Sequence, residues 1–297
     1  MQKVLEAYFD LDFLDELSTP RQKKDGNFYS TYTAEIQSGY LLSENSQASV
    51  ILKEIPPAQA SVYEKLSTLW NPYIESVFGV VSDGKQYISI NEFIHKPQSL
   101  LYPSQTLAEK RSLSLEDYIN DYGCLSETEA IIFLIQLCQG LESIASHSLV
   151  HGDVAPQNIL LTDRLFLLPP TYKRMKGLHQ KVSLKLIDFD ITSKVKNENH
   201  MVTVVAGTNP YAAPEILDYR NPTNRVDIYS LGCVLCFMLT GKSPKQLSSQ
   251  ELRQKCSFRI RRIIAKCTAD YSKRYKKISA LRHRLEWLLR ILFHLSS

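Results

Sequence analysis

The spacing of apolar residues changes from a strand-like to a helical pattern along the chain. Between residues 28 and 94 the segments FYSTYTAEI, ASVILKEI and QYISINEFI alternate or are rich in β-branched residues, which is typical of strands. One helix is expected among them, because a Pro-Pro pair precedes AQASVYEKLSTLW and an Asn-Pro pair follows it. A Ser-Asp-Gly sequence predicts a turn before the last strand.

From about residue 113 onward, apolar residues recur at helical spacing in SLEDYIND, TEAIIFLIQLCQGLESIASH, DIYSLGCVLCFMLTG and FRIRRIIAKC. A small β-rich part followed by a larger helical part predicts an α+β fold of two lobes. We therefore divide the chain into an N-terminal extension (1–24), an N-lobe (25–94), a Pro-punctuated hinge or insertion (95–112) and a C-lobe (113–297).

The composition is that of an ordinary globular protein, with 44% hydrophobic and 22% charged residues in 297 positions. Six cysteines in a chain of this length do not indicate a disulfide framework, and no His or Cys set has zinc spacing. Cys233 and Cys236 form a C-x-x-C, but they lie in an unbroken apolar run and are interpreted as one buried helical face. A reducing, cytoplasmic location is expected.

No transmembrane segment is expected, because acidic residues interrupt the apolar N-terminus and the last apolar stretch is shorter than the roughly 20 residues a span requires. The net charge of +4 is unevenly placed, with twelve Lys and Arg against two acidic residues between Glu251 and Arg284. An acidic partner could use these basic C-terminal helices, and a solvated exterior is the alternative. Nucleic acid is not expected, since no aromatic stacking pattern accompanies the charge.

The densest chemical signal is HGDVAPQNILL, in which Asp153 follows a long helix and Asn158 comes five residues later. A second signal is LKLIDFD, a strand with Asp188 at its end. Phosphoryl transfer requires neutralisation of phosphate charge and a carboxylate that orients the attacking hydroxyl. Asp153 fits the second requirement, and Asn158 and Asp188 carry the oxygen atoms that magnesium accepts. Each piece alone would also suit other metal sites.

Six motifs together resemble those of eukaryotic-like (Hanks-type) serine/threonine protein kinases, most closely the bacterial type. HGDVAPQN resembles the His-Arg-Asp…Asn catalytic loop, and IDFD resembles Asp-Phe-Gly. GTNPYAAPE, VDIYSLGC, ASVILKEI and KCTADYSKRY resemble four further kinase segments, all in the family's order over residues 25–290. The resemblance implies a two-lobed protein-kinase-like fold, with ATP and Mg²⁺ as cofactors and a protein as substrate.

The same resemblance implies a role for each matching residue. Lys53 would hold the ATP phosphates, Asp153 would be the catalytic base, and Thr208 would line the position of the substrate hydroxyl. Asn158 and Asp188 would bind magnesium. Besides Lys53, the residues assigned to nucleotide binding are Gly26, Glu64, Asn91, Glu92 and Ile94.

Four further residues are expected to be structural. Asp227 would hold the catalytic loop by hydrogen bonds to its backbone, and it also suits a helix N-cap. Glu215 would pair with Arg274 and hold the helical lobe together. His151 would pack beneath the magnesium-binding loop rather than carry a proton.

Two departures from the family concern the nucleotide. The glycine-rich loop retains only Gly26, although glycine lets the backbone approach phosphates closely. The glutamate that should pair with Lys53 falls at Val62 in the family's register, and Glu64 is the only acidic residue of that helix. Two residues along a helix are about 200° apart, so either the helix is turned or the ion pair is absent.

Two further departures concern catalysis. Gly152 replaces the catalytic-loop arginine, which predicts activity that does not wait for a phosphate on the activation segment. Ala155 stands in place of a lysine that contacts the γ-phosphate, and Asp190 replaces the glycine of Asp-Phe-Gly.

The leading hypothesis is a magnesium-dependent protein kinase that transfers the ATP γ-phosphoryl to Ser or Thr. One alternative is a pseudokinase scaffold with weak or no ATP binding, motivated by the reduced glycine loop and the unclear partner of Lys53. The other is a small-molecule phosphotransferase of the aminoglycoside-kinase type, whose loop also carries His-Gly-Asp. GTNPYAAPE and Arg274 argue against this last alternative.

Overall fold

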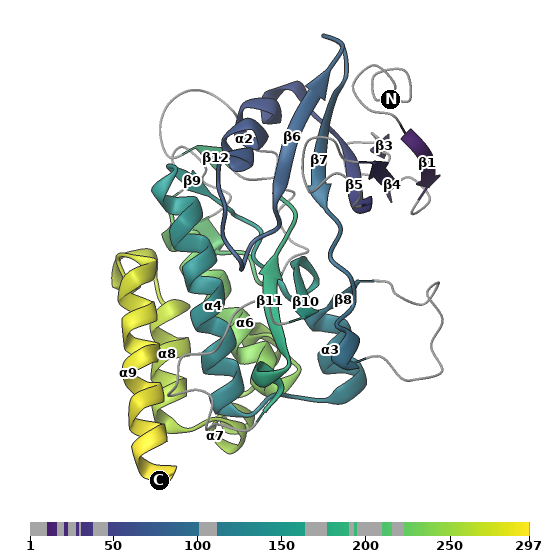
Figure 1. The fold of residues 1–297 in the computed structure, drawn as a ribbon. Coiled ribbons are helices and arrows are strands. Elements are labelled where there is room, and N and C mark those ends of the chain that lie inside the picture. Colours follow the sequence, from purple (N-terminus) through teal and green to yellow (C-terminus); the bar gives the residue numbers. More distant parts are fainter. Residues whose placement is uncertain are drawn as a thin grey trace. The chain divides into compact units, whose positions relative to one another are not determined.

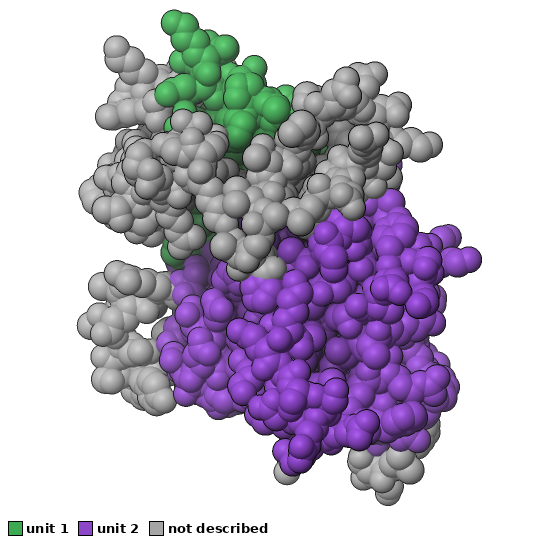
Figure 2. All heavy atoms as spheres, turned by 180° about the vertical axis from the view of Figure 1, so that it is seen from behind, with its two compact units in different colours: residues 1–70, 75–93 green, residues 71–74, 94–297 purple. Residues whose placement is uncertain are grey.

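The computed structural model describes residues 11–16, 21–22, 28–29, 31–37, 47–100, 112–163, 177–189, 193–194, 210–215 and 223–296, with side-chain surroundings from residue 50 onward. The chain forms two compact units, which are described separately below (Figure 2). Unit 1 comprises residues 1–70 and 75–93, and unit 2 comprises residues 71–74 and 94–297.

Unit 1 contains a five-stranded antiparallel sheet in the order β1-β4-β5-β7-β6 (Figure 1). Its strands are β1 Leu11–Glu16, β4 Thr31–Gln37, β5 Gln47–Ile55, β6 Val77–Ser82 and β7 Tyr87–Glu92, and a separate pair is β2 Arg21–Gln22 with β3 Phe28–Tyr29. The strands of the expected N-lobe are confirmed. Residues 11–16, which the sequence analysis placed in the N-terminal extension, pair with β4 at the edge of the sheet.

The helix of unit 1, α2, spans Pro57–Ser67 and begins where the Pro-Pro pair predicts. Pro57 occupies the first helical turn, where the missing N–H of proline costs nothing. The helix buries Ala60, Val62, Tyr63 and Leu66. The predicted turn is also present, because the Oδ1 atom of Asp83 accepts hydrogen bonds from the amides of Lys85 and Gln86 at 2.8 and 2.9 Å.

Unit 2 is mainly helical. Its helices are α3 Leu115–Tyr122, α4 Glu127–Ser146, α6 Arg225–Thr240, α7 Ser249–Lys255, α8 Phe258–Cys267 and α9 Ile278–Ser296. Short 3₁₀ turns are η1 Gln98–Leu100, η3 Pro156–Asn158, η4 Leu178–Gln180, η6 Pro244–Gln246 and η7 Tyr271–Lys273. A three-stranded sheet has the order β11 (Val182–Leu186), β10 (Ile159–Asp163), β8 (Leu113–Ser114), and a second pair joins β12 (Ser193–Lys194) to β9 (Leu149–Val150).

Helix α4 is the central helix of unit 2. It begins with a capping box, in which the Ser126 hydroxyl accepts from the Glu129 amide while the Glu129 carboxylate accepts from the Ser126 amide. Among the described helices, it is the one long and apolar enough to cross a membrane, and 67% of its most apolar window is buried inside the protein. That burial is the pattern of a core helix.

Helices α6 and α9 pack against α4. Figure 1 shows α4 and α9 side by side. The guanidinium of Arg282 on α9 donates to both carboxylate oxygens of Glu142 on α4, at 2.9 and 3.1 Å. Helix α6 carries Cys233 and Cys236, which are both buried and free. The interpretation of the C-x-x-C as a buried helical face is confirmed.

Candidate active site

The centre of the candidate site is the loop between β9 and β10. The side-chain amide of Asn158 donates to the backbone oxygen of Asp153 at 3.0 Å and to its Oδ2 atom at 2.9 Å. Asn158 is buried in η3, while Asp153 is half-buried. The two polar residues that the sequence analysis selected five positions apart are therefore in direct contact. Because the Asn158 nitrogen is engaged with Asp153, its Oδ1 atom is the one left to bind a cation.

The carboxylate of Asp227 anchors the backbone of this loop by hydrogen bonds. This buried carboxylate accepts hydrogen bonds from the backbone amides of His151 at 3.2 Å and Gly152 at 2.8 Å. The predicted role of Asp227 is confirmed. The N-cap interpretation is wrong, because α6 begins two residues earlier and its N-cap is Asn224. Burial raises the pKa of Asp227 to about 7, and the two amide hydrogen bonds partly oppose that rise.

Gly152 has a backbone reason for being a glycine. Its φ angle is +81°, in the left-handed region that residues with a Cβ atom adopt only at a cost. This conformation directs the Gly152 amide to Asp227. The sequence analysis saw here only the loss of an arginine, since a φ angle cannot be read from the residue type.

His151 connects the loop to the end of β11. Its Nδ1 atom accepts from the Asp153 amide at 3.2 Å, so the proton is assigned to Nε2, which donates to the backbone oxygen of Ile187 at 3.2 Å. Burial lowers the pKa of His151 to about 4, although the nearby charge of Asp188 raises it. A neutral, fully buried imidazole confirms the structural role that was expected.

Strand β11 brings Asp188 to the same place. The Ile187 amide donates to the backbone oxygen of Asn158 at 2.9 Å, so the residue before Asp188 is bonded to both ends of the loop. Asp188 has a φ angle of +67°, which is uncommon for a residue other than glycine and is often found at functional positions. The ring of Phe189 lies 5.2 Å from that of His151. Asp153, Asn158 and Asp188 thus belong to one hydrogen-bonded assembly.

Oxygen is the donor atom that this assembly offers to a metal. No cluster of three His, Cys, Asp or Glu side chains lies close enough to hold a metal ion in the described part of the chain. Asn158 and Asp188 instead provide an amide oxygen and a carboxylate, which are hard ligands that suit Mg²⁺ together with water and phosphate oxygens.

Three candidate nucleotide-binding residues lie in the sheet of unit 1. Lys53 is opposite Ser89, and Ile51 is opposite Asn91. Residues two apart on a strand, and residues opposite each other on neighbouring strands, share a face, so Lys53 and Asn91 point to the same side. Asn91 is 2% exposed, and its Oδ1 atom has no hydrogen-bond partner among the described residues. Glu92 accepts from the Ser76 amide at 3.1 Å.

The structure tests whether Glu64 is the acidic partner of Lys53. Val62 on α2 is buried, whereas Glu64 is exposed, and no ion pair or hydrogen bond joins Glu64 to Lys53 in the described structure. The suggestion that a turned helix brings Glu64 to Lys53 is therefore not supported.

Other predicted residues have mixed outcomes. Ile94 belongs to unit 2 and is buried, and its backbone oxygen accepts from the Ser112 hydroxyl at 2.6 Å. Gly26, Thr208 and Asp190 lie outside the described residues.

The predicted pair of Glu215 and Arg274 is confirmed. The Arg274 guanidinium, whose side chain is 1% exposed, forms an ion pair with both oxygens of Glu215, one of them at 2.8 Å. Arg274 also donates to the backbone oxygens of Ala269 at 2.7 Å and Arg225 at 3.2 Å, and it stacks 4.8 Å from the ring centre of Tyr229.

The basic helices of unit 2 correct one argument from the sequence. Arg284 lies 4.2 Å from the ring centre of Trp287 on α9, and Lys266 lies 4.5 Å from that of Tyr275. Aromatic side chains therefore do accompany the charge, contrary to the sequence analysis. An acidic partner for this surface stays a prediction.

A two-lobed α+β fold with a catalytic-type loop defines a class of phosphotransferases. The sequence model of the protein kinase domain family matches residues 43–295, so this chain belongs to the protein kinase domain family. A crystal structure of the Rad53 kinase domain and SCD2 superposes with a TM-score of 0.57 at 19% identity, covering 86% of this chain and 84% of that one, which shows the kinase fold.

Among similar curated proteins are human serine/threonine-protein kinase ULK1, 30% identical over 57% of this chain, and ATG1 of Debaryomyces hansenii, 32% identical over 60%. The alignments cover only 16% and 21% of those relatives. Both relatives are eukaryotic serine/threonine kinases, so the expected bacterial type finds no support among them.

Proposed function

We propose that this chain is a protein serine/threonine kinase that transfers the γ-phosphoryl of ATP to a protein hydroxyl in a Mg²⁺-dependent reaction. The observation that carries this proposal is the assembly of Asp153, Asn158 and Asp188 by the hydrogen bonds of Asp227, His151 and Ile187. Membership of the protein kinase domain family and the likeness to serine/threonine kinases support it.

In this proposal Asp153 orients the acceptor hydroxyl and accepts its proton. The bond from Asn158 to Oδ2 fixes the carboxylate, and the amide bonds to Asp227 fix the backbone on which it sits. His151 stays neutral near pH 7, because its pKa of about 4 is far below that pH, so it positions Asp153 without exchanging protons.

Mg²⁺, when bound, would neutralise negative charge that develops on the transferred phosphoryl group. Asn158 would hold it through Oδ1 and Asp188 through its carboxylate. The chemistry of these donors fits the ion.

The nucleotide would be held by unit 1 through Lys53 and Asn91. The buried, unpartnered Oδ1 atom of Asn91 fits a ligand that donates a hydrogen bond, as the exocyclic amine of adenine does, because a buried acceptor without a donor costs about 1–3 kcal/mol. Lys53 on the same face of the sheet would contact the phosphates.

Two finer proposals concern control and location. Gly152 offers no side-chain cation, and its amide is bonded to Asp227, so we infer that activity does not require a phosphate on the activation segment. All six cysteines are free thiols, and five of them are buried, which supports a cytoplasmic location.

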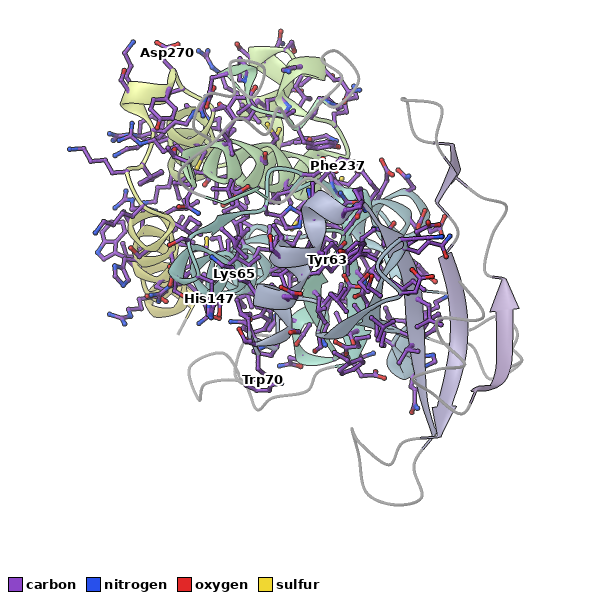
Figure 3. The ribbon with its side chains drawn as sticks, turned by 90° about the horizontal axis from the view of Figure 1, so that it is seen from above. Tyr63, Lys65, Trp70, His147, Phe237 and Asp270 are labelled. Carbon is purple, nitrogen blue, oxygen red and sulfur yellow. The ribbon has the colours of Figure 1, made fainter. Side chains whose placement is uncertain are left out.

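The test is phosphorylation of the protein itself or of a generic Ser/Thr acceptor, measured with labelled ATP and Mg²⁺. We expect activity from the wild type, none from Asp153→Asn, and wild-type activity from Asp270→Asn. Asp270, labelled in Figure 3, is an exposed aspartate whose ion pair with Lys273 contributes little, so this control removes the same charge from a surface position outside the loop. The absence of phosphorylation by both the wild type and Asp153→Asn would contradict the proposal.

The scaffold alternative keeps one specific observation in its favour, which is the absence of the Lys53–Glu64 ion pair. Thermal unfolding with and without Mg²⁺-ATP distinguishes the two. A nucleotide at 100 times its Kd stabilises the folded state by about 2.7 kcal/mol, so a clear rise in Tm supports the kinase. An unchanged Tm at millimolar nucleotide supports the scaffold.

A further inference from the structure

The last three helices of unit 2 carry more positive charge than their own acidic residues can neutralise. Between residues 251 and 290 there are thirteen Lys and Arg against three acidic residues. Each of the three is already paired with a cation: Glu251 with Lys242, Asp270 with Lys273 and Glu286 with Arg282. The arginines and lysines that lie elsewhere on α8 and α9 therefore have no acidic partner within this region.

Three of these cations lie around Tyr275, which precedes α9, and we call Arg262, Lys266 and Arg284 the basic cluster. Arg262 and Lys266 are four residues apart on α8, so they share one side of that helix. The Nζ atom of Lys266 lies 4.5 Å from the ring centre of Tyr275. Burial raises the pKa of Tyr275 to about 12, and the charges of Arg284 and Arg262 oppose that rise. No described carboxylate forms an ion pair with a member of the basic cluster.

Two large aromatic side chains lie exposed beside the basic cluster. Phe258 begins α8 and is 63% exposed, and Trp287 on α9 is 46% exposed. The guanidinium of Arg262 lies 5.7 Å from the ring centre of Phe258, and that of Arg284 lies 4.2 Å from the ring centre of Trp287. The attraction between a cation and an aromatic ring increases when both are withdrawn from water. This surface therefore combines unneutralised cations with rings that favour a less hydrated environment.

An anionic membrane surface fits this combination better than other polyanions do. Proteins that bind at the membrane interface contact the headgroup phosphates through Lys and Arg, and they place Trp or Phe at the boundary with the acyl chains. A single nucleic acid strand would require open ring faces for its bases, and Arg284 covers one face of Trp287. An acidic protein segment would account for the cations but not for the two exposed rings beside them.

We propose that the basic cluster, together with Phe258 and Trp287, docks this protein on membranes that contain anionic phospholipids. The cations would contact headgroup phosphates, and the two rings would enter the headgroup region. This contact is peripheral, since the described helix that is long and apolar enough to cross a membrane, α4, lies mostly inside the protein. The inference does not depend on the proposed kinase activity, and it would bring that activity close to acceptor proteins at a membrane.

The test is co-sedimentation of the chain with vesicles of phosphatidylcholine alone and with vesicles of equal parts phosphatidylcholine and phosphatidylserine. We expect the wild type to bind only the second kind. Each cation at such a surface contributes about fivefold to the partition coefficient, so Arg262→Gln combined with Arg284→Gln should lower it about 25-fold. The matched control, Lys65→Gln combined with Lys85→Gln, removes two exposed charges of unit 1 and should stay near the wild-type value (Figure 3 labels Lys65).

The fluorescence of Trp287 tests whether the rings enter the membrane. The chain has two tryptophans, so Trp70→Phe leaves Trp287 as the only one. Its emission should shift to shorter wavelength with vesicles that contain phosphatidylserine and stay unchanged with phosphatidylcholine alone. Trp287→Ser should weaken vesicle binding, whereas Trp70→Ser, which removes a 72% exposed tryptophan from unit 1, should not.

The inference is overturned if the wild type binds both kinds of vesicle equally or binds neither, or if the double arginine variant binds as the wild type does. Binding to polyuridylate or polyglutamate without binding to vesicles would overturn it as well, and would assign the basic cluster to nucleic acid or acidic protein. Circular dichroism shows whether each variant is folded. If the double variant is not, the exposed Lys266→Gln replaces it, with an expected loss of about fivefold. None of these assays requires ATP, so their failure is distinct from a failure of the proposed function.

Discussion

Replacement of Asp227 perturbs the support of the catalytic loop without removing any residue proposed to contact substrate. Asp227→Ala leaves the buried amides of His151 and Gly152 without an acceptor. Each unsatisfied buried amide costs about 1–3 kcal/mol, so the expected loss is about 2–6 kcal/mol. Asp227→Asn keeps one acceptor oxygen for Gly152 but turns an NH₂ group toward the His151 amide. Asp227→Asn should therefore lower the free energy of unfolding by about 1–3 kcal/mol, because only the hydrogen bond from the His151 amide is lost.

The difference in unfolding free energy between the wild type and Asp227→Asn should depend on pH, because the pKa of Asp227 is raised. Because its pKa rises from 3.8 to about 7 on folding, the carboxyl binds a proton more tightly in the folded protein. Its contribution to stability is complete below pH 3.8 and is lost as the pH rises to 7. The loss is at most about 1.4 kcal/mol per pH unit, and with a folded-state pKa of about 7 it amounts to about 2.3 kcal/mol between pH 5 and pH 7. Asparagine does not titrate, so the stability gap between wild type and Asp227→Asn should narrow over this range.

The assay is urea unfolding at several pH values between 5 and 8, followed by tryptophan fluorescence. Trp287 reports on unit 2, and replacement of the 72% exposed Trp70 by Phe removes the signal of unit 1 at little cost. The other titrating groups are common to wild type and Asp227→Asn, so their pH-dependent contributions cancel when the two free energies of unfolding are subtracted. A gap that stays constant or widens with pH would refute the reasoning, because the two amide hydrogen bonds would then outweigh the burial of the charge.

Two further predictions concern buried groups of unit 2. Arg274→Lys should destabilise unit 2 by about 2 kcal/mol or more in urea unfolding, because one ammonium cannot replace the forked contacts to Glu215 and two backbone oxygens; a loss below 0.5 kcal/mol would contradict this account. One thiol per chain, that of the exposed Cys124, should react rapidly with a thiol reagent under native conditions, and the other five should react only after unfolding. Mass spectrometry of the labelled protein identifies the modified residue, and rapid labelling of Cys233 or Cys236 would show that the buried helical face is misassigned.

The sequence predicted best those features that a single local rule determines. Helix α8 has the predicted bounds, Phe258–Cys267, because apolar spacing sets its face and the Ser257 hydroxyl caps its first turn. Arg274 and Asp227 were predicted because the matching motifs assign each a charged or polar contact, and a buried ionisable group must have partners.

The features that the sequence did not reveal depend on tertiary packing. Strand β1 was missed because its sequence, LDFLDE, pairs with β4 at an edge, and no local rule connects segments that far apart. The φ angle of Gly152 and the unpartnered oxygen of Asn91 are set by neighbouring elements. The exposure of Glu64 follows from helical geometry once Val62 faces inward, and the two-residue spacing already indicated opposite faces.

The left-handed backbone at Asp188 limits what can replace this residue. Asparagine, aspartate and glycine tolerate such a conformation best, and two of these three carry a side-chain oxygen. A descendant that gave up catalysis would therefore tend to retain an oxygen-bearing residue at this position for conformational reasons alone. Of the three polar residues of the site, Asp153 and Asn158 have negative φ angles and no such constraint, so their retention or loss in lineages of this chain would be the more informative record of selection for phosphoryl transfer.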